Sequence, residues 1–114
     1  MTRGEIWLAE FDTSDGSEAG YTCPVLIVQD DSFNKSKIGT FVVLPLTRNL
    51  RLSDAPGNVF LRRKEAKLEN DSVIMVAQIY AIDRGRLKEK ISKVPKEIME
   101  QAEKGMKLVL GINK

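Results

Sequence analysis

The 114-residue chain contains one cysteine, Cys23, and no histidine. A cysteine nucleophile needs a neighbouring base to generate its thiolate, and histidine most often provides it. A single thiol cannot form an internal disulfide, and a Cys/His metal cluster requires histidine. The composition therefore excludes a Cys/His catalytic pair and a zinc site built from both residue types.

Two adjacent carboxylates, Asp30 and Asp31, are the next candidates for chemistry because carboxylate pairs can hold a divalent cation. Adjacent residues of a strand point to opposite faces, so these two are poorly placed to share one ion. We interpret them as solvated acids at a strand end. No metal ion or other cofactor is expected.

Charge is distributed unevenly along the chain. Residues 1–31 carry one basic and seven acidic side chains, whereas residues 48–67 carry six basic and two acidic ones. Lysine and arginine neutralise a phosphate backbone and release its counterions, so the middle segment suits a nucleic-acid surface. A solvated loop and strand edge explains the same run equally well.

The elements that position these residues are mostly strands. Five segments show the apolar runs or alternation of β-strands: residues 4–11, 24–29, 40–46, 59–62 and 72–82. Polar, glycine-containing segments at 12–20 and 48–58 predict loops. Pro45 has no amide hydrogen, so its strand should end, bulge or lie at an edge there, which places Thr47 at the strand exit.

From Pro95 onward the pattern becomes helical. Apolar residues recur at helical spacing with Lys and Glu between them: Ile98, Met99, Ala102, Met106, Val109 and Leu110. This stripe predicts a C-terminal amphipathic helix, which Gly105 weakens in the middle. Five or so strands with one long helix predict a β-rich α+β fold, either a small barrel or a strongly bent sheet.

The length suits one domain over residues 1–114, because a chain of this size buries a single core. No apolar stretch approaches the roughly 20 residues that cross a bilayer. The first residues enter a strand-like pattern and lack the apolar segment of a signal peptide. We therefore expect no membrane association and a cytoplasmic location.

Six motifs in order then point to a family. They are Arg3-Gly4-Glu5-Ile6-Trp7, Gly16-Ser17-Glu18, Pro24 to Asp31, Leu44-Pro45-Leu46-Thr47, Asp71 to Ile79 and Ile82 to Leu87, followed by a Leu-Gly-Ile tail. Together they resemble the MazF/PemK family of sequence-specific endoribonuclease toxins. The resemblance implies an SH3-like small barrel (MazF/PemK/CcdB-like), a homodimer, metal-independent cleavage of single-stranded RNA, and restraint by a cognate acidic antitoxin.

The resemblance also assigns catalytic positions. In the family, an arginine before the Pro-Val-Leu run and a threonine or serine ending the third strand converge on the scissile phosphate. Thr47 matches the second, but Cys23 stands at the arginine position. Three explanations remain open: an inactivating substitution, a different cation such as Arg48 or Arg86 at the phosphate, or a protein that binds RNA or a partner without cutting.

The remaining substrate-binding predictions follow the same resemblance. They are Ser17, Glu18, Asp30, Asn34, Arg48, Gln78 and Arg86. Trp7 and Phe11 could stack on bases, although on an N-terminal strand core or dimer contacts are the more usual role. Gyrase-poisoning relatives carry a tryptophan near the C-terminus. This chain ends without an aromatic residue, which disfavours that activity.

Overall fold

The computed structural model describes residues 1–12 and 21–112. Its strands are β1 (Glu5–Phe11), β2 (Tyr21–Ile27), β3 (Thr40–Thr47), β4 (Val59–Leu61), β5 (Ser72–Ile74), β6 (Tyr80–Asp83) and β7 (Leu87–Lys93). Its α-helices are α1 (Asp31–Asn34) and α2 (Lys96–Leu110). Short 3₁₀ helices are η1 (Leu50–Asp54), η2 (Arg63–Glu65) and η3 (Arg84–Arg86).

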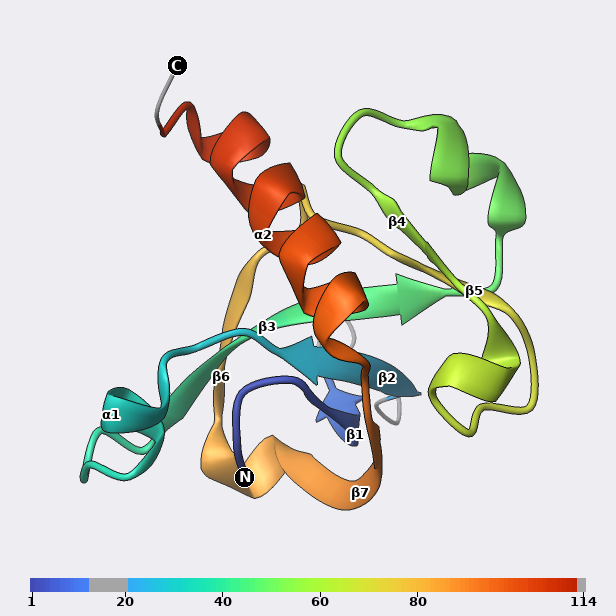
Figure 1. The fold of residues 1–114 in the computed structure, drawn as a ribbon. Coiled ribbons are helices and arrows are strands. Elements are labelled where there is room, and N and C mark those ends of the chain that lie inside the picture. Colours follow the sequence, from blue (N-terminus) through green and yellow to red (C-terminus); the bar gives the residue numbers. More distant parts are fainter. Residues whose placement is uncertain (13–20, 113–114) are drawn as a thin grey trace.

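All strand pairs are antiparallel, in the order β4-β5-β3-β2-β1-β7, and β6 also pairs with β3. The first half of β3 pairs with β6 and its last two residues pair with β5. The sheet therefore bends along β3, and β4 and β5 swing toward α2 (Figure 1). This bent, barrel-like sheet with a C-terminal helix confirms the predicted β-rich α+β class.

The prediction of one long strand at 72–82 was wrong. The chain leaves the sheet after Ile74 and returns at Tyr80, and the register against β3 shifts by three residues between the two strands. The break lies beside Pro45, which accepts a bond from Met75 N–H but has no N–H to donate. The proline thus interrupts the pairing of β3 without ending β3 itself.

Strand β7 and helix α1 were not predicted from the sequence. The sequence of β7, Leu-Lys-Glu-Lys-Ile-Ser-Lys, has too many charged residues to show an apolar pattern. It lies at an edge of the sheet, where lysines are common because they discourage pairing with another chain. Helix α1 has only four residues, too few for a periodic signal.

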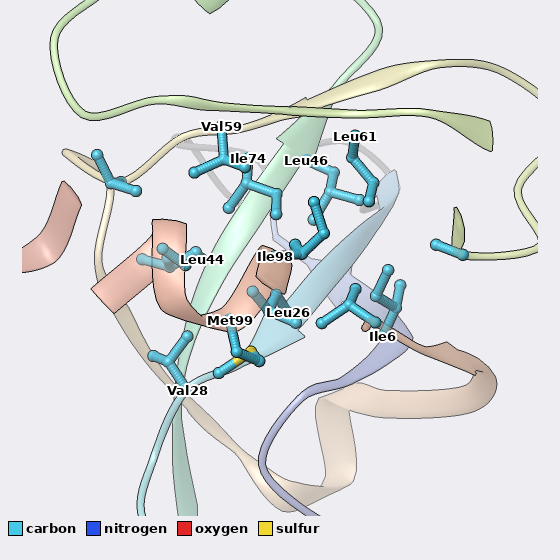
Figure 2. Packing of buried hydrophobic residues seen from close by; sticks show 14 residues of the cluster. Ile6, Leu26, Val28, Leu44, Leu46, Val59, Leu61, Ile74, Ile98 and Met99 are labelled. Carbon is cyan, nitrogen blue, oxygen red and sulfur yellow. The ribbon is translucent and has the colours of Figure 1, made fainter. Parts of the chain in front are cut away.

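The main core lies between α2 and the concave side of the sheet (Figure 2). Ile98, Met99 and Ala102 of α2 belong to the same buried cluster as Leu26 of β2 and Leu44 of β3. The predicted helix and its buried stripe are therefore confirmed. No helix within 1–12 and 21–112 has the length and apolar content needed to span a membrane.

A second, smaller cluster lies on the other face of β1, β2 and β3. It is formed by Ala9, Val25, Ile27, Phe41, Val43, Ile82 and Leu87. Trp7 and Phe11 pack against its edge, so packing is part of the role of both aromatic residues. Because β2 and β3 contribute to both clusters, their position and register are fixed by burial on two faces.

Candidate active site

Cys23 and Thr47 lie on neighbouring strands at facing positions. In the antiparallel pair of β2 and β3, Val25 is opposite Pro45, so continuing the register by two residues brings Cys23 opposite Thr47. The Cys23 thiol Sγ lies 3.4 Å from the carbonyl oxygen of Leu46, the residue before Thr47. The pairing of β2 with β3 therefore brings two residues that are 24 positions apart to the lining of one groove.

An open groove of about 750 Å³ borders this pair. Its walls come from β1, β2, the end of β3, β7 and the loop that precedes β5. The lining residues are Leu8, Tyr21, Thr22, Cys23, Pro24, Leu46, Thr47, Arg48, Lys67, Leu68, Glu69, Asn70, Ser72 and Ile91. The lining combines apolar side chains with hydroxyl, amide and charged groups, as binding sites commonly do.

The Cys23 thiol is half-buried and neutral. Burial raises the pKa of the Cys23 thiol above its ordinary value. Sγ donates toward the carbonyl oxygens of Pro24 at 3.3 Å and Leu46 at 3.4 Å. A neutral thiol held against backbone carbonyls offers neither a positive charge for a phosphate nor a thiolate for nucleophilic attack.

The Thr47 hydroxyl is positioned by one backbone hydrogen bond. Its Oγ1 accepts a hydrogen bond of 3.2 Å from Asn49 N–H at the start of the loop that follows β3. With one lone pair occupied in this way, the hydroxyl hydrogen remains available for a ligand in the groove. Thr47 thus lies at the strand exit that Pro45 predicted and lines the groove with a hydroxyl that can still donate.

Two basic side chains line the groove. Arg48 directly follows Thr47, and Lys67 comes from the loop after η2; both side chains are exposed. Glu69 of the same loop adds a carboxylate. Lys67 and Glu69 were not among the predicted site residues, although Lys67 belongs to the basic run whose charge suggested a phosphate surface.

Asp30 and Asn34 lie outside the groove lining and have structural roles. Asp30 caps α1, accepting bonds from Ser32 N–H at 3.0 Å and Ser32 Oγ at 2.6 Å. These bonds, chiefly that from the Ser32 hydroxyl, lower the pKa of Asp30. Asn34 is buried; its amide oxygen accepts from Gln29 Nε2 at 2.9 Å, and its amide nitrogen donates to the Gln29 carbonyl oxygen at 3.0 Å and to Asp31 Oδ1 at 2.9 Å. Its predicted contact with substrate is not supported by this position.

Gln78 and Arg86 also lie outside the groove lining. Gln78 is exposed in the turn between β5 and β6, not within an apolar strand as the sequence suggested. Arg86 forms a two-point contact with Asp12, at 2.9 Å and 2.5 Å, in a separate pocket that includes Glu10 and Phe11. Of the two alternative cations, the structure therefore brings Arg48 to Cys23 and Thr47 and directs Arg86 elsewhere.

Ser17 and Glu18 lie outside the described residues, so their predicted contacts are not addressed by the geometry. Across the described part of the chain, no group of three or more Asp, Glu, Cys or His side chains is arranged to hold a metal ion. The polar groups that line the groove include the hydroxyl of Thr47, the cations of Arg48 and Lys67 and the carboxylate of Glu69, among other hydroxyl and amide side chains. That set is suited to binding a phosphodiester and stabilising charge on it.

Comparison with known proteins assigns the class. A family model described as PemK-like, MazF-like toxin of type II toxin-antitoxin system matches residues 2–110. Endoribonuclease MazF6 of Mycobacterium tuberculosis and Endoribonuclease MazF2 of Mycobacterium bovis are each 32% identical over 112 residues, covering 98% of both chains. The chain belongs to this toxin family.

Solved structures agree on the fold. An endoribonuclease in complex with its cognate antitoxin from a mycobacterial species superposes with a TM-score of 0.79 at 19% identity, covering 100% of this chain and 98% of the other. A MazE-MazF structure from Deinococcus radiodurans gives a TM-score of 0.81 at 20% identity, covering 99% and 97%. The bent sheet and its C-terminal helix are therefore the fold of the family.

Proposed function

We propose that this protein is an endoribonuclease toxin that cleaves single-stranded RNA at a short sequence without a metal ion, and that its active site is the groove beside Cys23 and Thr47. The observation that carries the proposal is the meeting of a held Thr47 hydroxyl with Arg48 and Lys67 in one groove. The curated relatives named endoribonuclease share the chain over 98% of its length.

Cleavage requires that the 2′-hydroxyl lose a proton, that the 5′-oxygen gain one, and that the phosphate be stabilised in the transition state. The ribose 2′-oxygen forms a bond to the adjacent phosphorus while the bond to the 5′-oxygen breaks, giving a 2′,3′-cyclic phosphate and a 5′-hydroxyl. The 2′-hydroxyl gives its proton to water, and the 5′-oxygen takes one from water. Negative charge grows on the phosphate in the transition state, so pre-positioned donors and cations at that phosphate accelerate the step.

In this scheme Thr47 donates its hydroxyl hydrogen to a non-bridging oxygen of the scissile phosphate. Arg48 follows it directly in the chain and attracts the phosphate backbone to the same end of the groove. Cys23 occupies the position of the family arginine and contributes no charge, because burial keeps its thiol protonated. The cation must come from the other side chains of the groove, or cleavage is slow.

A second candidate function rests on that neutral thiol. A chain without the family arginine could bind RNA or its antitoxin and leave RNA uncut. Removing one donor to the transition state typically costs about 10²- to 10³-fold in rate, whereas ground-state binding to lysine and arginine persists. This candidate predicts RNA affinity that falls with salt and RNA ends that do not change.

The deciding experiment compares the native protein with Cys23→Arg in excess EDTA on a mixed RNA substrate, with the ends mapped by mass spectrometry. Cleavage by both proteins to 2′,3′-cyclic phosphates supports the proposal, with the charge supplied by another groove residue. Cleavage by the arginine form alone identifies a scaffold inactivated at position 23. Absence of cleavage by both, with RNA still bound, favours the binding protein.

The proposal extends to partners. We expect a homodimer acting on RNA in the cytoplasm and an acidic antitoxin segment that covers the groove, because a surface that attracts phosphate also attracts carboxylates. The mycobacterial endoribonuclease that shares this fold is described with its cognate antitoxin. Binding of the neighbouring gene's product should weaken when Arg48 of the groove and Arg51 of the adjoining η1 are neutralised. If that variant bound equally well, the groove would not be part of the antitoxin interface.

A further inference from the structure

Lys67 adopts a left-handed backbone conformation, which residues other than glycine seldom adopt. Its φ is +52°, and it is the only residue other than glycine with a positive φ within 1–12 and 21–112. It follows η2, where the amide of Leu68 donates to the carbonyl oxygen of Arg63 at 3.0 Å and closes the turn. Such left-handed positions after a helix are usually occupied by glycine.

The turn itself has no need of a lysine. Its hydrogen bond is made by backbone atoms, and glycine would adopt the same φ without the contact between Cβ and the backbone that disfavours it for other residues. A non-glycine residue at such a position therefore costs folding free energy. Strained residues of this kind concentrate at functional sites, where the side chain has a use outside the turn.

The position of Lys67 suggests that use. It lines the same groove as Cys23, Thr47 and Arg48. Its side chain is exposed, and it takes part in none of the ion pairs formed among residues 1–12 and 21–112. An ammonium group on a flexible four-carbon chain can follow a phosphate oxygen as charge develops on it.

We propose that Lys67 is a catalytic residue that supplies, from the loop after η2, the positive charge that Cys23 cannot give to the scissile phosphate. The inference rests on the proposed nuclease function. Lys67 keeps its proton throughout and contacts a non-bridging oxygen while the 2′-oxygen bond forms and the 5′-oxygen bond breaks. The proton leaving the 2′-hydroxyl and the proton reaching the 5′-oxygen are exchanged with water, as above.

The test uses Lys67→Gly, Lys67→Ala and Lys67→Arg, with Lys64→Ala as the matched control. Lys64 is an exposed lysine of η2 in the same basic run and is not among the groove-lining residues. For each purified protein, kcat and KM are measured in EDTA on a short single-stranded RNA that the native chain cleaves, together with the thermal midpoint.

Lys67→Gly is the decisive variant because it relieves the backbone strain while removing the charge. We expect its thermal midpoint to equal or exceed that of the native chain, and its kcat to fall about 10²- to 10³-fold. Lys67→Arg should retain kcat within about tenfold, since its charge is preserved. Lys64→Ala should match the native protein. Combining Cys23→Arg with Lys67→Gly should restore cleavage.

The outcomes separate this inference from the function it rests on. If the native chain cleaves in EDTA and Lys67→Gly cleaves equally well, Lys67 is not the cation and the nuclease function stands. If Cys23→Arg cleaves and the native chain does not, Lys67 fails to supply the charge. The inference about Lys67 is then overturned, whereas the groove remains a nuclease site. If neither protein cleaves any RNA, both proposals fall.

Discussion

Gly105, in the middle of α2, lies directly against the backbone of Gly57. A Cβ added to Gly105 would stand 2.2 Å from the Gly57 carbonyl oxygen and 2.9 Å from Val76 Cγ1. The two glycines let the helix approach the loop before β4 more closely than any side chain would allow. The glycine that weakens the helix in isolation is thus what allows the helix to dock.

Gly105→Ala should therefore destabilise the protein although alanine is the better helix former. The gain in helix propensity is about 1 kcal/mol, and the clash with backbone that cannot move aside should outweigh it, at the upper end of the roughly 1–3 kcal/mol that overpacking costs. Urea unfolding measures the difference. Gly85→Ala is the control, because nothing lies within 4 Å of its added Cβ. A stabilised Gly105→Ala protein would contradict the close packing.

Thr47→Val should reduce kcat/KM about 10²- to 10³-fold, because valine keeps the shape and loses the hydroxyl donor. Thr47→Ser, which keeps the donor, should stay within about tenfold of the native value, an allowance for serine's freer rotation. Single-turnover cleavage of one RNA by the three proteins measures this. Equal rates for Val and Ser would show that the hydroxyl takes no part in the step.

Glu5 should make stability depend on pH below about 4.5. Burial by itself would raise the pKa of Glu5, but bonds from Trp7 Nε1, from Thr2 and from Lys90 outweigh it and lower the pKa from 4.5 to about 2. The unfolded chain then binds the proton first, so stability is full above pH 4.5 and is lost as the pH falls to 2. The loss is roughly 3 kcal/mol, at about 1.4 kcal/mol per pKa unit.

Chemical unfolding of Glu5→Gln between pH 2 and 6 tests this. The variant should be less stable than the native protein at pH 6 and should approach it at pH 2, where the native carboxyl is protonated too. Glu100→Gln, on the exposed side of α2, serves as the control and should keep the native pH dependence. If the stability of Glu5→Gln changed with pH in parallel with that of the native protein, the Glu5 carboxylate would not be the source of the pH dependence.

Cys23 should react slowly with iodoacetamide near neutral pH. Only the thiolate reacts, and burial raises the pKa of the Cys23 thiol, so the reactive fraction at pH 7.5 is smaller than for free cysteine. The rate should keep rising with pH after the rate of free cysteine has levelled off. Mass spectrometry of timed samples measures it, with the urea-unfolded protein as the reference. Faster reaction in the folded state would indicate a thiolate and reopen a nucleophilic role.

The sequence by itself determined the family, the apolar strands and the C-terminal helix. These features depend on residues close together in the chain: the branched runs of β2 and β3, the spacing of Ile98, Met99 and Ala102, and motifs of four to eight residues. Local periodicity and propensity encode which face of each element is buried, so they can be deduced without knowing the partners. Thr47 was assigned in the same way, from Leu44-Pro45-Leu46-Thr47.

Tertiary structure alone decided which charges meet in the groove. Arg86 and Lys67 are both basic residues in polar segments, yet the first is bound by Asp12, 74 positions away, and the second lines the groove with Cys23. Likewise, the sequence pattern predicted that Gln78 lies in a buried strand, because nothing near it in the sequence shows that β3 changes partner at Pro45. Contacts between distant segments depend on strand register and loop paths, which no local pattern specifies.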